Sequence, residues 1–331
     1  MRARLTIFAF LALTGCSSLP LSYLDSDAPI GGRIAQLGWG MLAISCAVVV
    51  IITALVIIAS LGGGRDGAPG ELAVRRDAGG MRWIYIGVGI SSVVLAISAI
   101  WTLMTLRAVA EPSAKTAPLT IGIDAHQWWW EADYRPEDPA DHFATANEIH
   151  IPIDVPVRIE LRSSDVIHSF WVPKLAGKTD VIPGRVNSIW IEATKPGIYR
   201  GQCAEYCGAE HALMSFRIIA EPVSQYKNWQ QAELAGASLN DAAAQRGYPV
   251  FAAHCGSCHA IRGTQSGGVY GPDLTDLGAR RTLAAGVLQN NPNELAYWIR
   301  HAQEVKPGAR MPDVEVPDNE LQPLVTFLEQ H

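Results

Sequence analysis

The residues with the most distinctive chemistry lie in one short stretch, 201–214, with the sequence GQCAEYCGAEHALM. Cys203 and Cys207 are four residues apart, His211 follows four residues later, and Met214 comes three residues after that. A disulfide would leave the imidazole and the thioether without a role, and zinc is bound by cysteine, histidine and carboxylate rather than by methionine. Thiolate, imidazole and a weak axial methionine are the ligands of copper electron-transfer sites. The stretch therefore predicts copper binding.

Two cysteines in one loop favour a pair of coppers that share bridging thiolates, and such a pair needs a histidine besides His211. We prefer His168, because it lies in residues 164–173, where a predicted strand end runs into a turn. In a cupredoxin sandwich one ligand comes from such a position and the others come from the last long loop. Met214 has no competitor as the axial ligand, because it is the only methionine in 118–222. The histidines considered are His126, His142, His150 and His168.

A second motif, CGSCH at 255–259, is the attachment signature of c-type heme. Cys255 and Cys258 would form thioethers to the heme, and His259 would ligate the iron. Met311 is the only methionine after the copper loop, and its surroundings resemble the axial loop of class I cytochromes c. Since His/Met ligation raises the reduction potential and closes the iron to small ligands, we expect this heme to carry electrons rather than to catalyse.

Composition separates the N-terminal part from the rest. The net charge of −6, without a long basic run, argues against a nucleic-acid partner. Charged residues make up only 18% of the chain, below the roughly 25% usual in soluble domains. The deficit lies in two uncharged runs, for which we predict membrane helices at about 35–61 and 83–106, because each exceeds the ~20 residues that cross a bilayer. The loop between them contains Arg65, Arg75, Arg76 and Arg82, which places it in the cytoplasm and the rest of the chain outside.

The first residues have the pattern of a bacterial export signal. Two arginines precede the apolar run at 5–13, which is too short to span a bilayer. Residues 13–16, Leu-Thr-Gly-Cys, resemble a lipobox, so we expect cleavage after residue 15 and lipid modification of Cys16.

The external part divides into a β-sandwich and a helical domain. Apolar and polar residues alternate at 148–153 and 157–161, as in half-buried strands. Short helices are predicted near the C-terminus, including 293–302 and 319–330. The predicted parts are a signal peptide (1–15), a transmembrane hairpin (16–110), a cupredoxin-like sandwich (111–225), a polar helical linker (226–246) and an all-α cytochrome c domain (247–331).

Together these features resemble cytochrome c oxidase subunit II with a fused class I cytochrome c. The match covers about 34–222 and includes HQWWWE at 126–131 and KTDVIPGR at 178–185, in the family's order and spacing. The resemblance implies a dinuclear CuA centre in which the cysteines bridge the coppers and each copper has one histidine. Its ligands would be His168, Cys203, Glu205, Cys207, His211 and Met214.

The resemblance also implies roles outside the thiolate pair. Glu205 would bind copper through its backbone carbonyl, while its side chain would face the catalytic subunit and help to bind magnesium. Trp128 would be the residue at which electrons from cytochrome c reach the copper, and Trp129 and Trp130 would serve packing. The family often has a glutamate for proton uptake three residues before the second membrane run; here that residue is Gly80, so proton uptake by this chain is in doubt.

The resulting hypothesis is subunit II of a proton-pumping cytochrome c oxidase in a bacterial inner membrane. Electrons would pass from the heme through CuA to subunit I, which reduces oxygen to water; subunit III and a soluble or membrane cytochrome c donor are the other expected partners. One alternative is the electron-input subunit of a copper-containing nitric oxide reductase. A second is a free-standing, membrane-anchored electron carrier, against which Glu205 and the 178–185 motif argue.

Overall fold

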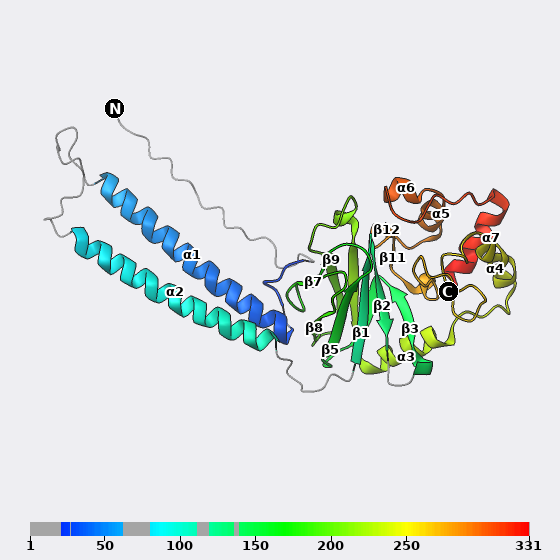
Figure 1. The fold of residues 1–331 in the computed structure, drawn as a ribbon, viewed down its shortest axis with the longest axis horizontal. Coiled ribbons are helices and arrows are strands. Elements are labelled where there is room, and N and C mark those ends of the chain that lie inside the picture. Colours follow the sequence, from blue (N-terminus) through cyan, green and yellow to red (C-terminus); the bar gives the residue numbers. More distant parts are fainter. Residues whose placement is uncertain (1–20, 27, 62–79, 111–118, 136–138, 331) are drawn as a thin grey trace, which may run out of the picture.

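The computed structural model describes residues 21–26, 28–61, 80–110, 119–135 and 139–330. A pair of long helices, a β-sandwich and a domain of short helices follow one another along the longest axis (Figure 1). This order confirms the predicted fold class. The predicted signal peptide at 1–15, Cys16 and the arginines at 65, 75 and 76 lie outside the described residues.

The two long helices, α1 (Pro29–Leu61) and α2 (Gly80–Ala110), are long and apolar enough to cross a membrane. Most of their large apolar side chains are exposed, as expected of residues that face lipid. They pack together where Gly40 meets Trp101, since a Cβ atom at Gly40 would lie 2.2 Å from the indole ring. A small residue is therefore required at this crossing.

The start of α1 is attached to the β-sandwich. Ser26 Oγ donates a hydrogen bond to the carbonyl of Lys174 at 2.5 Å, and the backbone N–H of Gly31 donates to the carbonyl of Leu175 at 3.1 Å. Lys174 Nζ also pairs with Asp25 at 3.1 Å. These contacts fix the orientation of the sandwich relative to the membrane helices.

Two five-stranded sheets make the sandwich, with the strand orders β3-β2-β1-β5-β8 and β4-β10-β9-β6-β7. The pairs β1–β5 and β4–β10 are parallel, and the other pairs are antiparallel. The strands are β1 (Leu119–His126), β2 (Trp129–Tyr134), β3 (Phe143–Ala146), β4 (Glu148–Pro152), β5 (Val157–Ser163), β6 (His168–Trp171), β7 (Thr179–Val181), β8 (Asn187–Ile191), β9 (Gly197–Cys203) and β10 (Ser215–Glu221).

The alternation of residue types explains why these segments are strands. In β5, Val157, Ile159 and Leu161 are fully buried, whereas Arg158 and Glu160 between them form an ion pair at 3.6 Å. Aliphatic and aromatic side chains of both sheets fill the core, and the same core continues to the sulfur atoms of the copper loop. The loop is thus held by the packed interior of the sandwich.

The polar helical linker predicted at 226–246 begins within helix α3 (Val223–Ala235), which packs on the sandwich. Trp229 stacks on His150, with ring centroids 4.1 Å apart and nearly parallel planes. Aromatic packing thus fixes a helix whose composition is otherwise polar, and only residues 236–241 connect it to the next helix.

The C-terminal domain is built from short helices around its own apolar core. Its first and last helices cross where Gly247 meets Phe327, because a Cβ atom at Gly247 would lie 2.3 Å from the Cβ of Phe327. The elements are α4 (Ala242–His254), η3 (Leu277–Ala279), β11 (Thr282–Leu283), β12 (Leu288–Gln289), α5 (Pro292–Arg300), α6 (Ala302–Val305) and α7 (Asp318–Glu329). Helices α5 and α7 correspond to the predicted helices at 293–302 and 319–330.

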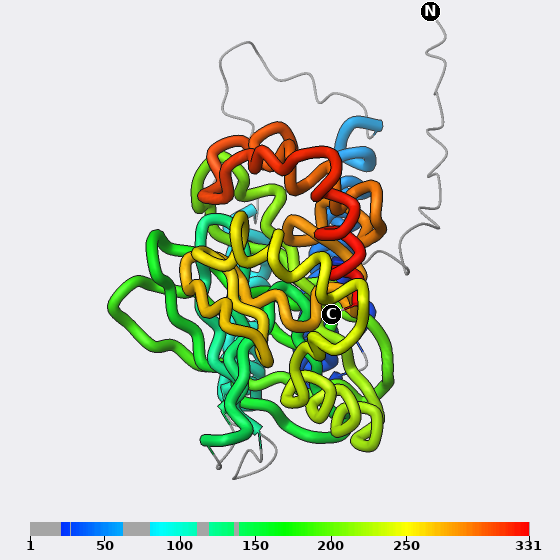
Figure 2. Tube along the Cα trace, turned by 90° about the vertical axis from the view of Figure 1, so that its right-hand side faces the viewer, coloured from blue at the N-terminus to red at the C-terminus, as the bar shows by residue number. Residues whose placement is uncertain are grey.

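Buried polar side chains join this domain to the sandwich, and Figure 2 shows its yellow-to-red coils in front of the green strands. Asp276 accepts a hydrogen bond from Thr145 Oγ1 at 2.9 Å and pairs with Arg280. Glu148 accepts one from the backbone N–H of Arg281 at 3.0 Å. The side chains of Thr145, Glu148, Asp276 and Arg280 are all buried. Each of the two carboxylates has a hydrogen-bond partner from the opposite domain, so the interface specifies one docked arrangement.

Glu233 of α3 is buried beside this interface. Burial raises the pKa of its carboxyl to about 9, and the nearby Asp276 carboxylate adds to the shift, while Arg280 opposes it. Glu233 is therefore protonated at neutral pH. A raised carboxyl pKa contributes stability that is fully present below the ordinary value near ~4.3 and that is lost as the pH rises through the folded-state value.

We predict that Glu233→Gln reduces the loss of stability between pH 5 and pH 8 by on the order of 2 kcal/mol, because the amide needs no proton to stay neutral. Urea titration of the detergent-solubilised chain at both pH values measures this. Glu315→Gln is the matched control, since Glu315 is exposed. Equal pH slopes in the wild type and Glu233→Gln would contradict the prediction.

Candidate copper and heme sites

Three neighbouring strands of one sheet position the predicted copper ligands. His168 is the first residue of β6, Cys203 is the last residue of β9, and Met214 immediately precedes β10. β6 pairs with β9 through Phe170 and Cys203, and the backbone N–H of Cys203 donates to the carbonyl of Met214 at 3.0 Å. Ligands far apart in the sequence are therefore brought together at one end of the sheet.

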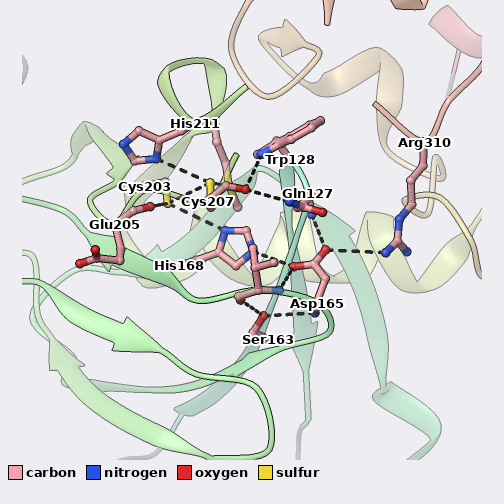
Figure 3. Close-up of polar contacts among 12 residues, drawn as sticks. Gln127, Trp128, Ser163, Asp165, His168, Cys203, Glu205, Cys207, His211 and Arg310 are labelled. Atoms are coloured by element: carbon pink, nitrogen blue, oxygen red, sulfur yellow. Dashed lines mark hydrogen bonds and ion pairs between the residues drawn. The ribbon is translucent and has the colours of Figure 1, made fainter. Parts of the chain in front are cut away.

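The donor atoms of this group converge on the two sulfurs (Figure 3). Cys203 Sγ lies 3.8 Å from Cys207 Sγ, 3.9 Å from His168 Nδ1 and 3.2 Å from the carbonyl oxygen of Glu205. Cys207 Sγ lies 3.6 Å from His211 Nδ1 and 3.8 Å from the Met214 sulfur. Each thiolate thus has its own set of additional donors, and the thiolates adjoin each other.

These separations fit metal ligation. A disulfide requires sulfurs about 2.05 Å apart, far less than the observed 3.8 Å. Ligand atoms placed tetrahedrally at about 2.0–2.3 Å from one metal lie roughly 3.3–3.8 Å from each other. The side-chain ligand atoms of His168, Cys203 and Cys207 lie within 4.8 Å of one another, and all three residues are buried. The thioether and the carbonyl beside them favour copper over zinc.

Asp165 fixes the orientation of the His168 ring. Its Oδ1 lies 2.8 Å from His168 Nε2, which directs Nδ1 toward Cys203 (Figure 3). Burial acts to raise the pKa of the Asp165 carboxyl, but hydrogen bonds from His168 and from the backbone N–H groups of Val166 and Gln127 outweigh it and lower the pKa. An ionised carboxylate on the outer ring nitrogen of a histidine is typical of metal sites.

Glu205 presents two different groups. Its carbonyl faces the sulfur pair, whereas its side chain points away from it and is 45% exposed (Figure 3). Lys178 of the 178–185 motif lies 3.7 Å from this carboxylate. An accessible carboxylate next to the copper loop is thus available to another subunit or ion.

The other histidines of the sandwich are engaged elsewhere. His126 stacks on Trp129 at 4.3 Å, His142 pairs with Asp133, and His150 stacks on the helix after the sandwich. None of the three belongs to the group of donors around the sulfurs within the described residues.

A cavity of about 440 Å³ lies in the C-terminal domain at its boundary with the sandwich. Cys255, Cys258, His259 and Met311 line it, together with a largely aliphatic wall. The apolar residues of this wall include Leu274, Leu277, Leu283, Leu295, Ile299, Val314 and Leu328. A cavity of this kind, with two thiols, an imidazole and a thioether on its walls, suits a c-type heme.

The backbone around His259 also fits such a group. His259 Nδ1 lies 2.8 Å from the carbonyl of Pro272, which leaves Nε2 as the free ring nitrogen. Gly271 packs against this ring, and a Cβ atom there would lie 2.5 Å from His259 Cε1. The imidazole is therefore held in one orientation by its neighbours.

Trp128 connects the two sites. It is only 8% exposed, it lines the cavity, and its Nε1–H donates to the carbonyl of Cys207 at 3.0 Å (Figure 3). Trp130 is fully buried in the sandwich core, as expected for packing, whereas Trp129 also lines the cavity. The residue expected to receive electrons at the surface is thus covered by the C-terminal domain.

The sequence interpretation missed three polar residues around these sites. Asp165 could have been found, because it is a carboxylate three residues from a proposed histidine ligand. Arg310, which lies 3.9 Å from Asp165, and the buried Lys306 gave no signal, because such residues are usually exposed.

Comparison with known proteins identifies the family. Residues 137–222 match the family described as cytochrome C oxidase subunit II, periplasmic domain, and residues 244–331 match cytochrome c. Cytochrome c oxidase subunit 2 of Alkalihalophilus pseudofirmus is 33% identical over 331 residues, covering 97% of this chain and 94% of the relative. This chain belongs to the cytochrome c oxidase subunit II family. The subunit 2 of Bacillus sp. (strain PS3) is 31% identical over 244 residues, with 69% and 67% covered.

A solved structure is also similar in sequence over one part. The periplasmic domain of subunit II of cytochrome oxidase of Bradyrhizobium japonicum is 31% identical and covers 35% of this chain and 93% of its own, with a TM-score of 0.33.

Membership of the subunit II family, with a cytochrome c domain, makes this chain an electron-transfer subunit of a heme-copper cytochrome c oxidase. It binds copper and c-type heme, and its partners include subunit I and a cytochrome c donor. Two apolar helices anchor it in a membrane, with a periplasmic domain outside. Family membership thereby favours the oxidase over both alternative functions.

We predict that Asp165→Ala lowers copper affinity by about 10–100-fold, because the His168 ring loses the group that orients it. Competition with a copper chelator measures this on the full chain. Asp180→Ala, at an exposed carboxylate on the neighbouring strand, is the control and should bind copper like the wild type. Equal affinity in Asp165→Ala and the control would show that Asp165 does not position the ligand.

Proposed function

We propose that this subunit takes electrons at its c-type heme and delivers them through a dinuclear CuA centre to subunit I, which reduces oxygen to water while the complex pumps protons. The observation that carries the proposal is the position of Trp128, which lines the heme cavity and donates a hydrogen bond to the carbonyl of Cys207. One side chain therefore spans the boundary between the two candidate sites.

When bound, heme and copper each supply a one-electron carrier, and the residues around them supply fixed positions. Cys203 and Cys207 would hold the two coppers as shared thiolate ligands, and each sulfur has additional donors close to it. His168 and His211 would bind one copper each, with Met214 and the carbonyl of Glu205 completing the two coordination shells. His168, Cys203 and Met214 lie at strand ends, where the sheet restrains their positions, and this would keep reorganisation small during transfer.

Cys255 and Cys258 would attach the heme through thioethers, and His259 and Met311 would ligate its iron. The same four residues line the cavity, and a carbonyl hydrogen bond orients the histidine. The donor would then reduce the cytochrome c domain rather than the sandwich, because that domain covers Trp128. Trp128 would act as the internal connection between the two carriers.

The exposed side of the copper loop would face subunit I. The Glu205 carboxylate, close to Lys178, is accessible there and would contribute to an interfacial magnesium site. Subunit III, the bacterial inner membrane and a lipid on Cys16 complete the proposed assembly. A contribution of this chain to proton uptake is not proposed, because Gly80 has no titratable side chain.

We predict that Cys207→Ser abolishes the mixed-valence copper signal in electron paramagnetic resonance, because an alcohol oxygen does not replace a bridging thiolate for soft copper. Cys46→Ser, a cysteine on the exposed face of α1, should leave the signal unchanged. A dinuclear spectrum in Cys207→Ser would refute the ligand assignment.

The order of the carriers is tested by stopped-flow reduction of the complete oxidase complex with reduced cytochrome c. Heme absorbance should change before copper absorbance. Trp128→Leu should leave heme reduction unchanged and slow copper reduction at least about tenfold. Removing the indole takes away the group that contacts both sites, and small losses of positioning cost large factors in rate. Trp190→Leu, on the far-edge strand β8, is the control. Reduction of copper before heme would show that electrons take another route.

A further inference from the structure

Lys306 is buried at the boundary between the two domains. It follows α6 directly, five residues before Met311, and is only 3% exposed. Lysine is among the residues least often buried, because removing an ammonium from water costs free energy unless its hydrogen bonds are replaced. A lysine in this position therefore requires an explanation.

The hydrogen bonds of its ammonium supply that explanation. Lys306 Nζ donates to the carbonyl oxygens of Trp128 at 2.6 Å, Leu213 at 3.1 Å and Ala284 at 3.5 Å. An ammonium has three donors, so its capacity is used fully. Trp128 and Leu213 belong to the sandwich and Ala284 to the cytochrome c domain, so one side chain ties segments of both domains.

Two of these acceptors adjoin the candidate copper site, since Trp128 also donates a hydrogen bond to the carbonyl of Cys207. Leu213 immediately precedes Met214, the proposed copper ligand. On the heme side, Gln303 Nε2 donates to the carbonyls of Ala309 at 2.8 Å and Met311 at 2.6 Å. The turn from Lys306 to Met311 is therefore internally braced, and a displacement of Lys306 would move the heme ligand with it.

Burial lowers the pKa of Lys306 to about 8, while the nearby charges of Glu210 and Cys207 oppose the shift. The ammonium form is still favoured at pH 7, which suits a group that faces three carbonyl oxygens. The local environment of the amine is thus poor in water, where hydrogen bonds of a charged donor are strong.

We propose that Lys306 is a positioning residue that holds the heme-ligand loop against the copper-ligand loop and so sets the separation of the two redox sites. The proposal rests on the proposed heme-to-copper transfer. Other contacts hold the domains together elsewhere, including Glu148 with Arg281 and Arg262 with the carbonyl of His142. Loss of the lysine should therefore loosen one edge of the interface without undocking the domain.

The test compares Lys306→Met with Arg262→Met in the complete oxidase complex. Arg262 Nη2 also donates to a carbonyl across the interface, at 3.0 Å, but far along the chain from either methionine ligand. Lys306→Met should slow heme-to-copper transfer by about tenfold or more. Reduction of the heme by cytochrome c should stay unchanged, and Arg262→Met should transfer electrons at the wild-type rate. Both neutral variants, Lys306→Met and Lys306→Gln, lower the potentials of the two sites by removing the ammonium charge, so a slower transfer in Lys306→Met than in Lys306→Gln reports the lost hydrogen bonds.

A second readout does not depend on turnover. Hydrogen exchange of the backbone amides at 306–311 and 211–214 should accelerate in Lys306→Met and not in Arg262→Met. Lys306→Gln, which keeps a shorter N–H donor, should give an intermediate transfer rate, and it provides the comparison if the methionine variant does not fold.

The outcomes separate the two levels of the proposal. A wild-type complex without heme-to-copper transfer would overturn the proposed function itself. If the wild-type complex transfers electrons and both Lys306→Met and Lys306→Gln transfer them at the wild-type rate, the positioning role alone is overturned. Faster amide exchange in Lys306→Met without slower electron transfer would also overturn it.

Discussion

The pairing of β6 with β9, and of β9 with β10, is the constraint on which the candidate copper site depends. His168 is 35 residues from Cys203, and only the register of these strands brings its ring to the sulfur pair. A shift of one residue in either pairing would turn the ligands to the opposite face of the sheet. The fully buried aromatic and aliphatic core beneath the strands makes such a shift costly.

Around this rigid centre, buried polar contacts join the two domains. Glu148, Asp276, Arg280 and Lys306 are all buried at the boundary, and each has hydrogen-bond partners. Buried charges contribute little net stability but penalise every arrangement that leaves them unpaired. These contacts explain why the domain docks in a single position. For electron transfer, a fixed distance between carriers matters more than the free energy of docking.

Docking of the cytochrome c domain also changes the surroundings of Trp128. On an isolated sandwich its indole would be available to a soluble donor. In this chain the fused domain covers it, and the same ring lines the heme cavity and contacts the copper loop. In the proposed electron route, Trp128 would be an internal connection, and the donor would meet the surface of the fused domain.

The sequence by itself determined whatever depends on residues close together in the chain. Uncharged runs predicted the membrane helices, alternation predicted the sandwich, and the spacings at 203–214 and 255–259 indicated copper and heme, because ligands in one loop or one turn are already near each other. His168 was predicted among four histidines from its place at a strand end near a turn, and the structure places its ring beside Cys203.

Tertiary structure alone decided the contacts between distant segments. The packing of α3, predicted as part of a polar helical linker, depends on the stacking of Trp229 on His150, 79 residues earlier. Lys306 lies 178 residues from Trp128, and the residues next to it in the sequence do not distinguish it from a surface lysine. Periodicity reports which face of an element is apolar but not which partner a polar side chain will find, because that partner exists only after the chain has folded.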